Sequence, residues 1–267
     1  MTGCAMIIRK SREEIARMAR AGAVVAAAHE EVAARLRPGM STLDLDRIAE
    51  DVILAHGAVP SFKGYHGFPA TLCTSPDATI VHGIPSADTV LDEGTVLSVD
   101  CGAIVDGFHG DSAVTLIVGG ESTVRPEVAR LVAETRRALW AGLAQVRAGN
   151  RLGDIGAAIE AVARPHGFGV VREYVGHGIG RSLHEDPSVP NYGRAGHGLQ
   201  LTPGWVIAVE PMFNLGGAAT RTLADGWTVV TADGRVSAHW EHTIAVTDDG
   251  PVVLTARSDE PSVPPVA

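Results

Sequence analysis

Four carboxylates of this chain lie at the ends of apolar segments that are typical of buried strands. Asp100 ends the largely apolar segment 95–99, and Asp111 follows it beyond the turn signal Asp106-Gly107. A two-residue loop at that turn would pair residue 100 with 113, which places Asp111 diagonal to Asp100 on one face of a hairpin. An isolated aspartate could simply cap a strand end. Two like charges on one buried face, however, repel each other unless a metal ion or a shared proton lies between them.

A second pair of carboxylates occurs later in the chain. Glu210 ends the apolar run 205–209, and Glu241 precedes the segment 242–246. Four buried carboxylates carry a charge of about −4, which two divalent cations can neutralise and one cannot, so the charge count favours a site for two metal ions. His177, which lies between two glycines, is the natural nitrogen ligand, although a histidine in such a position is more often only a loop residue.

The two pairs of carboxylates belong to an internal repeat. With an offset of 110 residues, the segment 94–100 aligns with 204–210, so that Asp100 corresponds to Glu210. An offset of 130 aligns Asp111 with Glu241, which implies about 20 additional residues in the second half. The four carboxylates would therefore meet where two related halves face each other.

This repeat predicts the fold class. We expect an α+β fold of two pseudo-twofold-related α/β halves, about 10–120 and 125–250, with helices outside a curved, mainly antiparallel sheet. No linker-like segment separates the halves, so residues 1–267 are interpreted as one domain. Capping and turn residues predict helices from Ser11 to about Leu36, from Ser41 to Gly57, from Pro126 to about Arg147, and over a fourth segment that ends at Gly167.

Composition excludes several classes of partner. The chain has 22 Lys and Arg residues against 31 Asp and Glu residues, a net charge of −9, and no segregated basic face, so we expect no nucleic-acid site. No run of about 18 apolar residues or signal-peptide pattern is present, which predicts no membrane span and no export. Three cysteines without CxxC spacing indicate neither a disulfide framework nor a cysteine zinc site. These features are typical of a cytoplasmic protein.

Six segments of the chain resemble type I methionine aminopeptidases of the pita-bread fold. They are GYHGFPATLCTS (64–75), IVHGIPS (80–86), VDCGAIVDGFHGD (99–111), GHGIGRSLHEDPSVPNYG (176–193), VIAVEPMFN (206–214) and SAHWEHTIAVTDDG (237–250). The resemblance extends from about residue 7 to 256. It is specific, because all five metal-ligand positions of the family occur here in the family's order and local context.

The resemblance implies a peptidase with two divalent metal ions. Asp100 would chelate one ion, Asp111 and Glu241 would bridge both, and His177 with Glu210 would complete the second. One imidazole among carboxylate oxygens suits Mn²⁺, Fe²⁺, Co²⁺ or Zn²⁺ and does not select among them. Residues near Asp77, Thr79 and Ser237 resemble a site for a monovalent cation in the family.

The resemblance also assigns catalytic and substrate-binding residues. Glu210 would transfer the proton from water to the leaving nitrogen, and His82 and His184 resemble histidines that contact the substrate. Leu183 differs from the phenylalanine common at its position, which is expected to change the shape of the pocket. The positions that match a pocket for the methionine side chain are Phe62, Tyr65, Phe68, Cys73, Leu183 and Trp227.

We therefore expect co-translational removal of the initiator methionine before a small second residue, by a hydroxide that two metal ions activate. The expected partners are nascent polypeptide N-termini close to the ribosome, and the expected form is a monomer. One alternative is an Xaa-Pro peptidase-like hydrolase of the same fold. Such enzymes generally carry a further N-terminal domain, whereas about ten residues precede the first helix here. A second alternative is a non-catalytic pita-bread binding module, but such proteins lose ligands, and all five are present.

Overall fold

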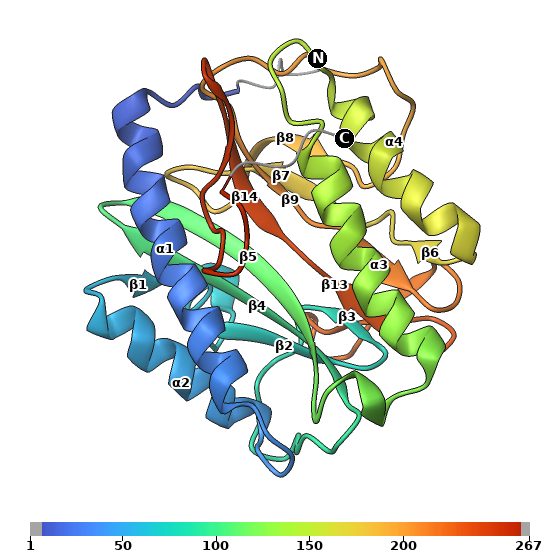
Figure 1. Cartoon of the computed structure of the whole chain (residues 1–267). Coiled ribbons are helices and arrows are strands. Elements are labelled where there is room, and N and C mark those ends of the chain that lie inside the picture. Colours follow the sequence, from blue (N-terminus) through green and yellow to red (C-terminus); the bar gives the residue numbers. More distant parts are fainter. Residues whose placement is uncertain (1–6, 263–267) are drawn as a thin grey trace.

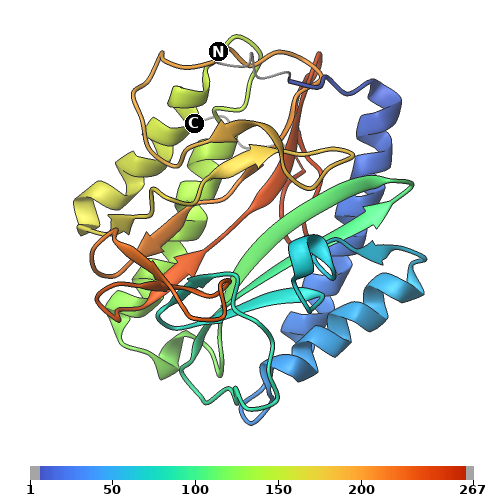
Figure 2. The same cartoon turned by 180° about the vertical axis from the view of Figure 1, so that it is seen from behind.

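A computed structural model of the chain describes residues 7–262, in which the helices cover one side of several antiparallel sheets. Figure 1 shows α1 on the left and α3 on the right in front of the strands, and Figure 2, seen from behind, shows the strands as the nearer layer. None of the helices within residues 7–262 has the length and apolar character needed to cross a membrane. The predicted α+β architecture is confirmed.

The first half consists of two helices and a four-stranded sheet. Its helices are α1 (Arg12–Arg35) and α2 (Thr42–Ala55), and its strands are β1 (Val59–Pro60), β2 (Leu72–Pro76), β4 (Val96–Val105) and β5 (Phe108–Ile117). Both helices begin with the predicted capping residues, because Ser11 forms a capping box with Glu14 and Ser41 forms one with Asp44. The predicted β4–β5 hairpin is also confirmed, with Asp100 opposite Ala113.

The second half repeats this arrangement. Its helices are α3 (Pro126–Leu143) and α4 (Leu152–Ala163), and its five-stranded sheet has the order β15 (Gly250–Val253), β14 (His242–Thr247), β9 (Val206–Val209), β7 (Gly176–Gly178) and β8 (Glu185–Val189). Helix α4 begins 110 residues after α2, as the repeat predicts. Helix α3 ends at Leu143, before the expected Arg147, because the chain leaves the helix in turns that bury Val146 completely.

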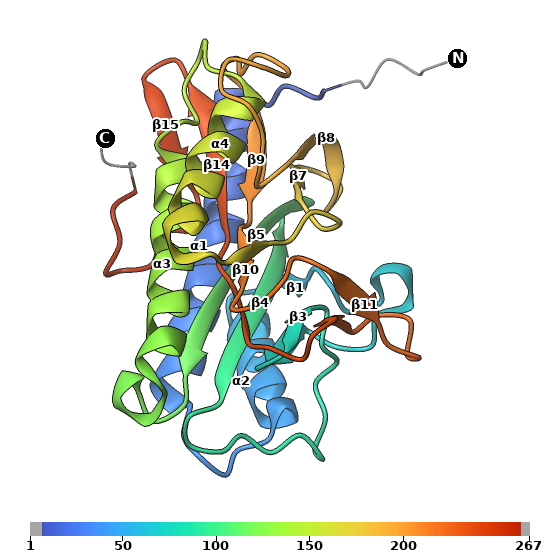
Figure 3. The same ribbon diagram turned by 90° about the vertical axis from the view of Figure 1, so that its right-hand side faces the viewer.

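Smaller elements complete the structure. One three-stranded sheet contains β13 (Ser237–His239), β10 (Met212–Asn214) and β6 (Gly169–Val170), and another contains β11 (Thr220–Thr222), β12 (Val229–Thr231) and β3 (Thr79–Val81). The single-turn helices are η1 (Tyr65–Gly67), η2 (Glu121–Thr123) and η3 (Arg164–His166). Figure 3 shows β8, β11 and η1 projecting on the side of the strands away from α1 and α3.

The two halves differ in strand register. Asp100 lies opposite Ala113 in the first half. If the strands of the second half paired in the same way, the residues 110 and 130 positions later, Glu210 and Thr243, would lie opposite each other. The structure instead places Thr243 opposite Ala208 and His242 opposite Val209. This shift of two residues brings Glu210, at the end of β9, alongside Glu241, at the start of β14. Asp100 and Asp111 are therefore diagonal neighbours in the first half, whereas Glu210 and Glu241 are direct neighbours in the second.

The halves are joined by hydrogen bonds between β5 and residues 239–243. Ala113 and Glu241 exchange backbone hydrogen bonds, from Glu241 N to Ala113 O (3.0 Å) and from Ala113 N to Glu241 O (3.4 Å). The Thr243 hydroxyl donates to the carbonyl of Asp111 (2.8 Å) and accepts from its N–H (3.1 Å). These bonds fix the backbones of two carboxylate residues from different halves relative to each other.

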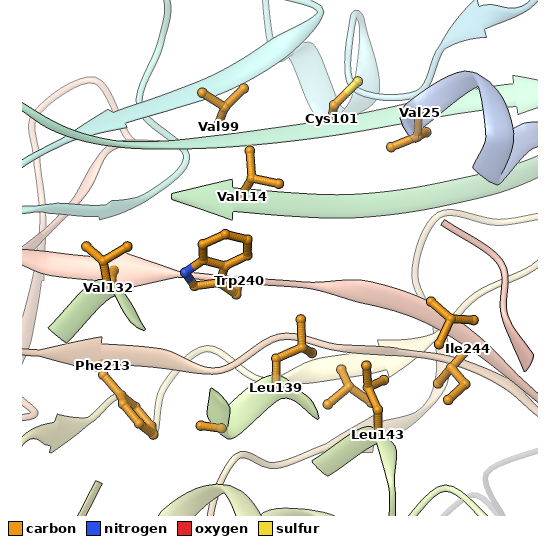
Figure 4. Packing of buried hydrophobic residues seen from close by; sticks show 14 of the residues in the cluster. Val25, Val99, Cys101, Val114, Val132, Leu139, Leu143, Phe213, Trp240 and Ile244 are labelled. Carbon is orange, nitrogen blue, oxygen red and sulfur yellow. The ribbon is translucent and has the colours of Figure 1, made fainter. Parts of the chain in front are cut away.

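The core lies between the helices and the strands. Figure 4 shows Trp240 between Val114 of β5 and Leu139 of α3. Helix α1 approaches β5 so closely that a Cβ atom added to Gly110 would lie 2.7 Å from the backbone nitrogen of Gly22. Only glycine allows this contact, which places α1 directly behind the strand that carries Asp111.

The segment after β15, residues 254–260, returns to the helical side of the molecule, and we call it the C-terminal clasp. Glu260, whose side chain is 1% exposed, lies 2.6 Å from Arg257 Nη2 and 2.9 Å from Arg136 Nη2 of α3. The Nε2 atom of His242 lies 3.2 Å from Glu260 Oε2. The N–H of Ser258 donates to Glu30 of α1. The clasp thus connects both long helices to the residue that follows Glu241.

Candidate metal and substrate site

The carboxylates that the sequence singled out meet where the two halves join. Asp111, His177 and Glu241 each offer a ligand atom within 4.8 Å of the others, and all three are buried. The Nε2 atom of His177 lies 3.8 Å from Asp111 Oδ2 and 3.6 Å from Glu210 Oε1. Asp100, on the neighbouring strand of the hairpin, contacts the carboxyl group of Asp111.

The electrostatics of this cluster favour a cation. Burial, followed by the charge of Asp111, raises the pKa of Asp100, Glu210 and Glu241 well above the usual range of carboxyl groups. Burial also raises the pKa of Asp111. Four carboxylates so close together cannot all ionise at neutral pH unless positive charge enters the site.

The hydrogen bonding within the site fits divalent metal ions. Asp100 Oδ1, Asp111 Oδ1 and Glu241 Oε1 are buried and have no hydrogen-bond partner among residues 7–262. Unpartnered buried oxygens are costly, and metal ligation would satisfy them. His177 Nδ1 lies 2.9 Å from the carbonyl of Gly178, so that Nε2 faces the carboxylates. Burial lowers the pKa of His177 to about 3, which keeps the ring neutral, as metal ligation requires.

A small cavity of about 130 Å³ opens beside the carboxylates. It is lined by all the residues expected to bind the divalent ions or the substrate, namely Phe62, Tyr65, Phe68, Cys73, His82, Asp100, Asp111, His177, Leu183, His184, Glu210, Trp227 and Glu241. Phe68 and Trp227 meet edge to face with ring centroids 5.1 Å apart, and Leu183 is 2% exposed. One part of the cavity is therefore apolar and the other is acidic. Cys73 and Cys101 are free thiols, while Cys4 lies outside the described residues.

His82 depends on an unusual backbone conformation. It has a φ of 60°, in the left-handed region, and a Cβ added to the following Gly83 would lie 2.1 Å from the carbonyl oxygen of Thr74 on β2. The tight approach of Gly83 to β2 positions His82 against Trp227 and Tyr174, whose ring centroids lie 6.4 Å and 5.7 Å away. Burial lowers the pKa of His82 to about 4, so the ring is neutral at pH 7.

His184 and Leu183 lie on a loop that a buried ion pair supports. Lys10 Nζ lies 2.6 Å from Glu185 Oε2, and the two side chains are 3% and 7% exposed. Glu185 also accepts a hydrogen bond from the N–H of Ser182 (3.2 Å). The pair fixes the loop from behind, while the Tyr65 hydroxyl lies 2.8 Å from His184 Nδ1 on the cavity side.

Three contributors to the site were not predicted from sequence. Tyr174 packs against His82, and the Lys10–Glu185 pair supports the substrate loop. The third, His239, has its Nε2 atom 3.9 Å from Glu210 Oε2, and this buried nitrogen has no hydrogen-bond partner among residues 7–262. The alternation of side chains along a strand would have placed His239 on the same face as Glu241. No comparable short-range signal connects Lys10 with Glu185.

The residues expected near a monovalent cation also lie together. The carbonyl of Asp77 accepts the N–H of Ser237 (2.8 Å), and the carboxylate of Asp77 accepts the N–H of Val96 (3.0 Å). Thr79 begins β3, two residues after Asp77. Asn214, opposite Ser237 in the sheet, has a buried Oδ1 without a hydrogen-bond partner in the described part of the chain.

Comparisons with known proteins agree with this geometry. The family model of metallopeptidase family M24 matches residues 16–248. The chain is 48% identical to the methionine aminopeptidase of Clostridium acetobutylicum, over 94% of this chain and 99% of the relative. It is 49% identical to methionine aminopeptidase 1 of Mycobacterium tuberculosis, over 96% and 97% of the two chains.

Solved structures give the same result for the fold. The crystal structure of the methionine aminopeptidase from Thermotoga maritima matches with a TM-score of 0.91 and 41% identity, over 94% of this chain and 100% of that chain. The prolidase from Pyrococcus furiosus matches with a TM-score of 0.71 at 19% identity, over 94% of this chain and 66% of that one, which shows a shared fold only. These matches confirm the pita-bread fold expected from the sequence.

Proposed function

The chain belongs to metallopeptidase family M24, and from this membership we propose that it removes the N-terminal methionine from new polypeptides whose second residue is small. The observation that carries the proposal is that an apolar cavity adjoins a cluster of buried carboxylates, three of whose oxygens have no hydrogen-bond partner among residues 7–262. An apolar side chain bound in the cavity would place the adjacent peptide bond near the carboxylates, because both groups of residues line the same cavity. An aminopeptidase needs this arrangement.

The residues that would hold the metal ions are those that meet at the junction of the halves. Asp100, Asp111, His177, Glu210 and Glu241 would together hold two divalent ions. The donor set, four carboxylates and one imidazole, suits Mn²⁺, Fe²⁺, Co²⁺ or Zn²⁺. When bound, such ions lower the pKa of water and polarise a peptide carbonyl.

The chain's own residues would bind the substrate and move protons. Phe62, Phe68, Leu183 and Trp227 would surround the methionine side chain and keep bulk water out of that part of the cavity. Glu210 would accept a proton from water and deliver it to the leaving nitrogen.

His82 and His184 would contact the peptide group, and as neutral rings each can donate one hydrogen bond. Near Asp77, Thr79 and Ser237, a monovalent cation would support the sheet beneath the site.

Release of free methionine from Met-Ala-Ser tests this proposal, with Leu-Ala-Ser as the matched control peptide. Protein stripped of metal should be inactive, and added Mn²⁺ or Co²⁺ should restore cleavage of the methionine peptide alone. Met-Lys-Ser should be a poor substrate because its second residue is large. Folded protein that cleaves neither peptide with any divalent metal would refute the proposal, and equal cleavage of both would refute the specificity.

We further propose that the protein acts as a monomer in the cytoplasm, on chains that leave the ribosome. This placement follows from the substrate, because initiator methionine is most accessible while the new N-terminus is still unfolded. Sedimentation at micromolar concentration should give the mass of one chain, and co-sedimentation with translating ribosomes should exceed that with ribosomes that carry no nascent chain. A stable dimer, or equal binding to both ribosome samples, would contradict these points.

A further inference from the structure

Tyr65 and His184 form a direct contact within the substrate cavity. The Tyr65 hydroxyl lies 2.8 Å from His184 Nδ1, and the two ring centroids are 5.4 Å apart. The residues are separated by 119 positions in the chain, since Tyr65 begins η1 and His184 immediately precedes β8. A wall residue of an apolar pocket needs no such hydrogen bond, so the contact requires its own explanation.

The contact joins the tautomer of His184 to the direction of the Tyr65 hydroxyl. A neutral imidazole has one N–H, and the hydrogen bond at one nitrogen sets the state of the other. His184 Nδ1 is the only hydrogen-bond partner of the Tyr65 hydroxyl among residues 7–262. A phenol that donates its single proton to Nδ1 leaves the histidine proton on Nε2. In the opposite arrangement Nδ1–H donates to the phenol oxygen, Nε2 keeps a lone pair, and the phenol proton turns to solvent, because the contact lies on the exposed side of the cavity.

We propose that Tyr65 is a positioning residue that holds His184 in its Nε2–H tautomer, so that the ring donates a hydrogen bond to the carbonyl oxygen of the bound peptide. This inference rests on the proposed function and extends it. Negative charge develops on that oxygen when the peptide bond is attacked, and a preorganised donor stabilises this charge. A lone pair at Nε2 would instead repel it.

The surroundings of both residues are rigid enough to maintain the contact. The backbone of Tyr65 donates to Phe62 O and accepts from Phe68 N, each at 2.9 Å, which closes a tight turn between Gly64 (φ 90°) and Gly67 (φ 89°). Burial, followed by the charge of Asp111, raises the pKa of the Tyr65 hydroxyl, so that it remains a donor in the pH range of the reaction. Behind His184, the Lys10–Glu185 pair fixes the loop.

The substitution Tyr65→Phe tests the proposal, because it removes the hydroxyl and keeps the aromatic wall. We expect kcat for Met-Ala-Ser to fall about tenfold, with KM changed less than twofold and metal content unchanged. In a His184→Ala background the same substitution should have no further effect on kcat, since its partner is absent. Tyr192→Phe is the matched control, because it removes a hydroxyl that lies against the carbonyl of Arg172, outside the cavity.

A spectroscopic measurement separates this inference from the proposed function. Imidazole ¹⁵N chemical shifts of metal-free and Zn²⁺-loaded protein should show the Nε2–H tautomer of His184 in the natural chain and a mixture of tautomers in Tyr65→Phe. An Nδ1–H tautomer in the natural chain would overturn the proposal, as would an equal loss of kcat in both backgrounds. If the natural chain releases no methionine, the proposed function fails, while the ¹⁵N shifts still decide the tautomer.

Discussion

Glu260 provides a strong test of how the structure is stabilised. Its carboxylate is almost completely buried, and it accepts hydrogen bonds from Arg257 (2.6 Å) and Arg136 (2.9 Å). The substitution Glu260→Gln keeps the size of the side chain and removes its charge. Arg257, whose side chain is only 8% exposed, would then retain a buried positive charge with no counter-charge in direct contact among residues 7–262.

The size of the effect follows from this geometry. Removing one partner of a buried ion pair costs about 3–5 kcal/mol. Arg136 is 39% exposed and would regain contact with water, which places the expected loss near the lower limit, at about 3 kcal/mol. For a chain of this length, that loss corresponds to a decrease of about 6–12 °C in Tm. The neighbouring Asp259, 70% exposed and 3.5 Å from Arg136, should contribute within about 0.5 kcal/mol.

The assay is urea unfolding of the natural chain, Glu260→Gln and Asp259→Asn at one fixed concentration of the same divalent metal. Burial alone would raise the pKa of Glu260, but contact with His242 and the charge of Arg257 outweigh burial and hold the pKa below its usual range. The folded state therefore binds fewer protons than the unfolded state. The contribution of Glu260 is fully present above the unfolded pKa of about 4.3 and decreases as the pH falls below it.

Two results would refute this reasoning. One is an equal, small loss of stability in Glu260→Gln and Asp259→Asn at pH 7, which would mean that burial of the carboxylate adds nothing. The other is a stability difference between the natural chain and Glu260→Gln that stays constant from pH 7 to pH 3, because a charge-dependent contribution must diminish over that range.

Three further predictions concern the site and the core. Asp111→Asn should abolish turnover and weaken metal binding measured by calorimetry. The control Asp51→Asn, on the exposed side of α2, should change neither. Undiminished turnover in Asp111→Asn would refute the two-metal site. His184→Ala should lower kcat about 10²-fold and retain full metal content, and loss of metal would identify His184 as a ligand instead. Gly110→Ala should cost about 2 kcal/mol in urea unfolding because the added methyl overlaps the backbone of α1, whereas Gly217→Ala, whose Cβ meets no atom closer than 3.8 Å, should be nearly neutral. Equal midpoints for these two variants would contradict the close contact.

Much of the fold could be predicted because the sequence repeats itself and its turns have strong local signals. The Asp106-Gly107 turn determined the register of the β4–β5 hairpin, the Ser11–Glu14 capping box marked the start of α1, and the candidate cap Ser41 marked the start of α2. The register of β9 and β14 could not be obtained in this way. These strands are joined by about 30 residues that form β10 to β13, and no short turn determines which residues face each other.

The parts of the candidate site that could be predicted are the charged side chains that lie in apolar, buried segments. A carboxylate inside an apolar run is costly without a partner, and that conflict identified Asp100, Asp111, Glu210 and Glu241. Lys10 and Glu185 carried no such signal, because each lies among other polar residues in the sequence. Their pairing across 175 positions exists only in the folded chain. Residues that support a site from behind are therefore the least visible in a single sequence.

The distribution of the proposed ligands between the halves has a consequence for the life of the protein. Asp100 and Asp111 come from the first half, and His177, Glu210 and Glu241 from the second, so bound cations act as a reversible cross-link between them. At a free metal concentration 100 times the Kd, such a cross-link adds about 2.7 kcal/mol to the stability of the folded state. Metal starvation would then increase digestion by proteases as well as reduce activity, and the amount of enzyme would follow the metal supply.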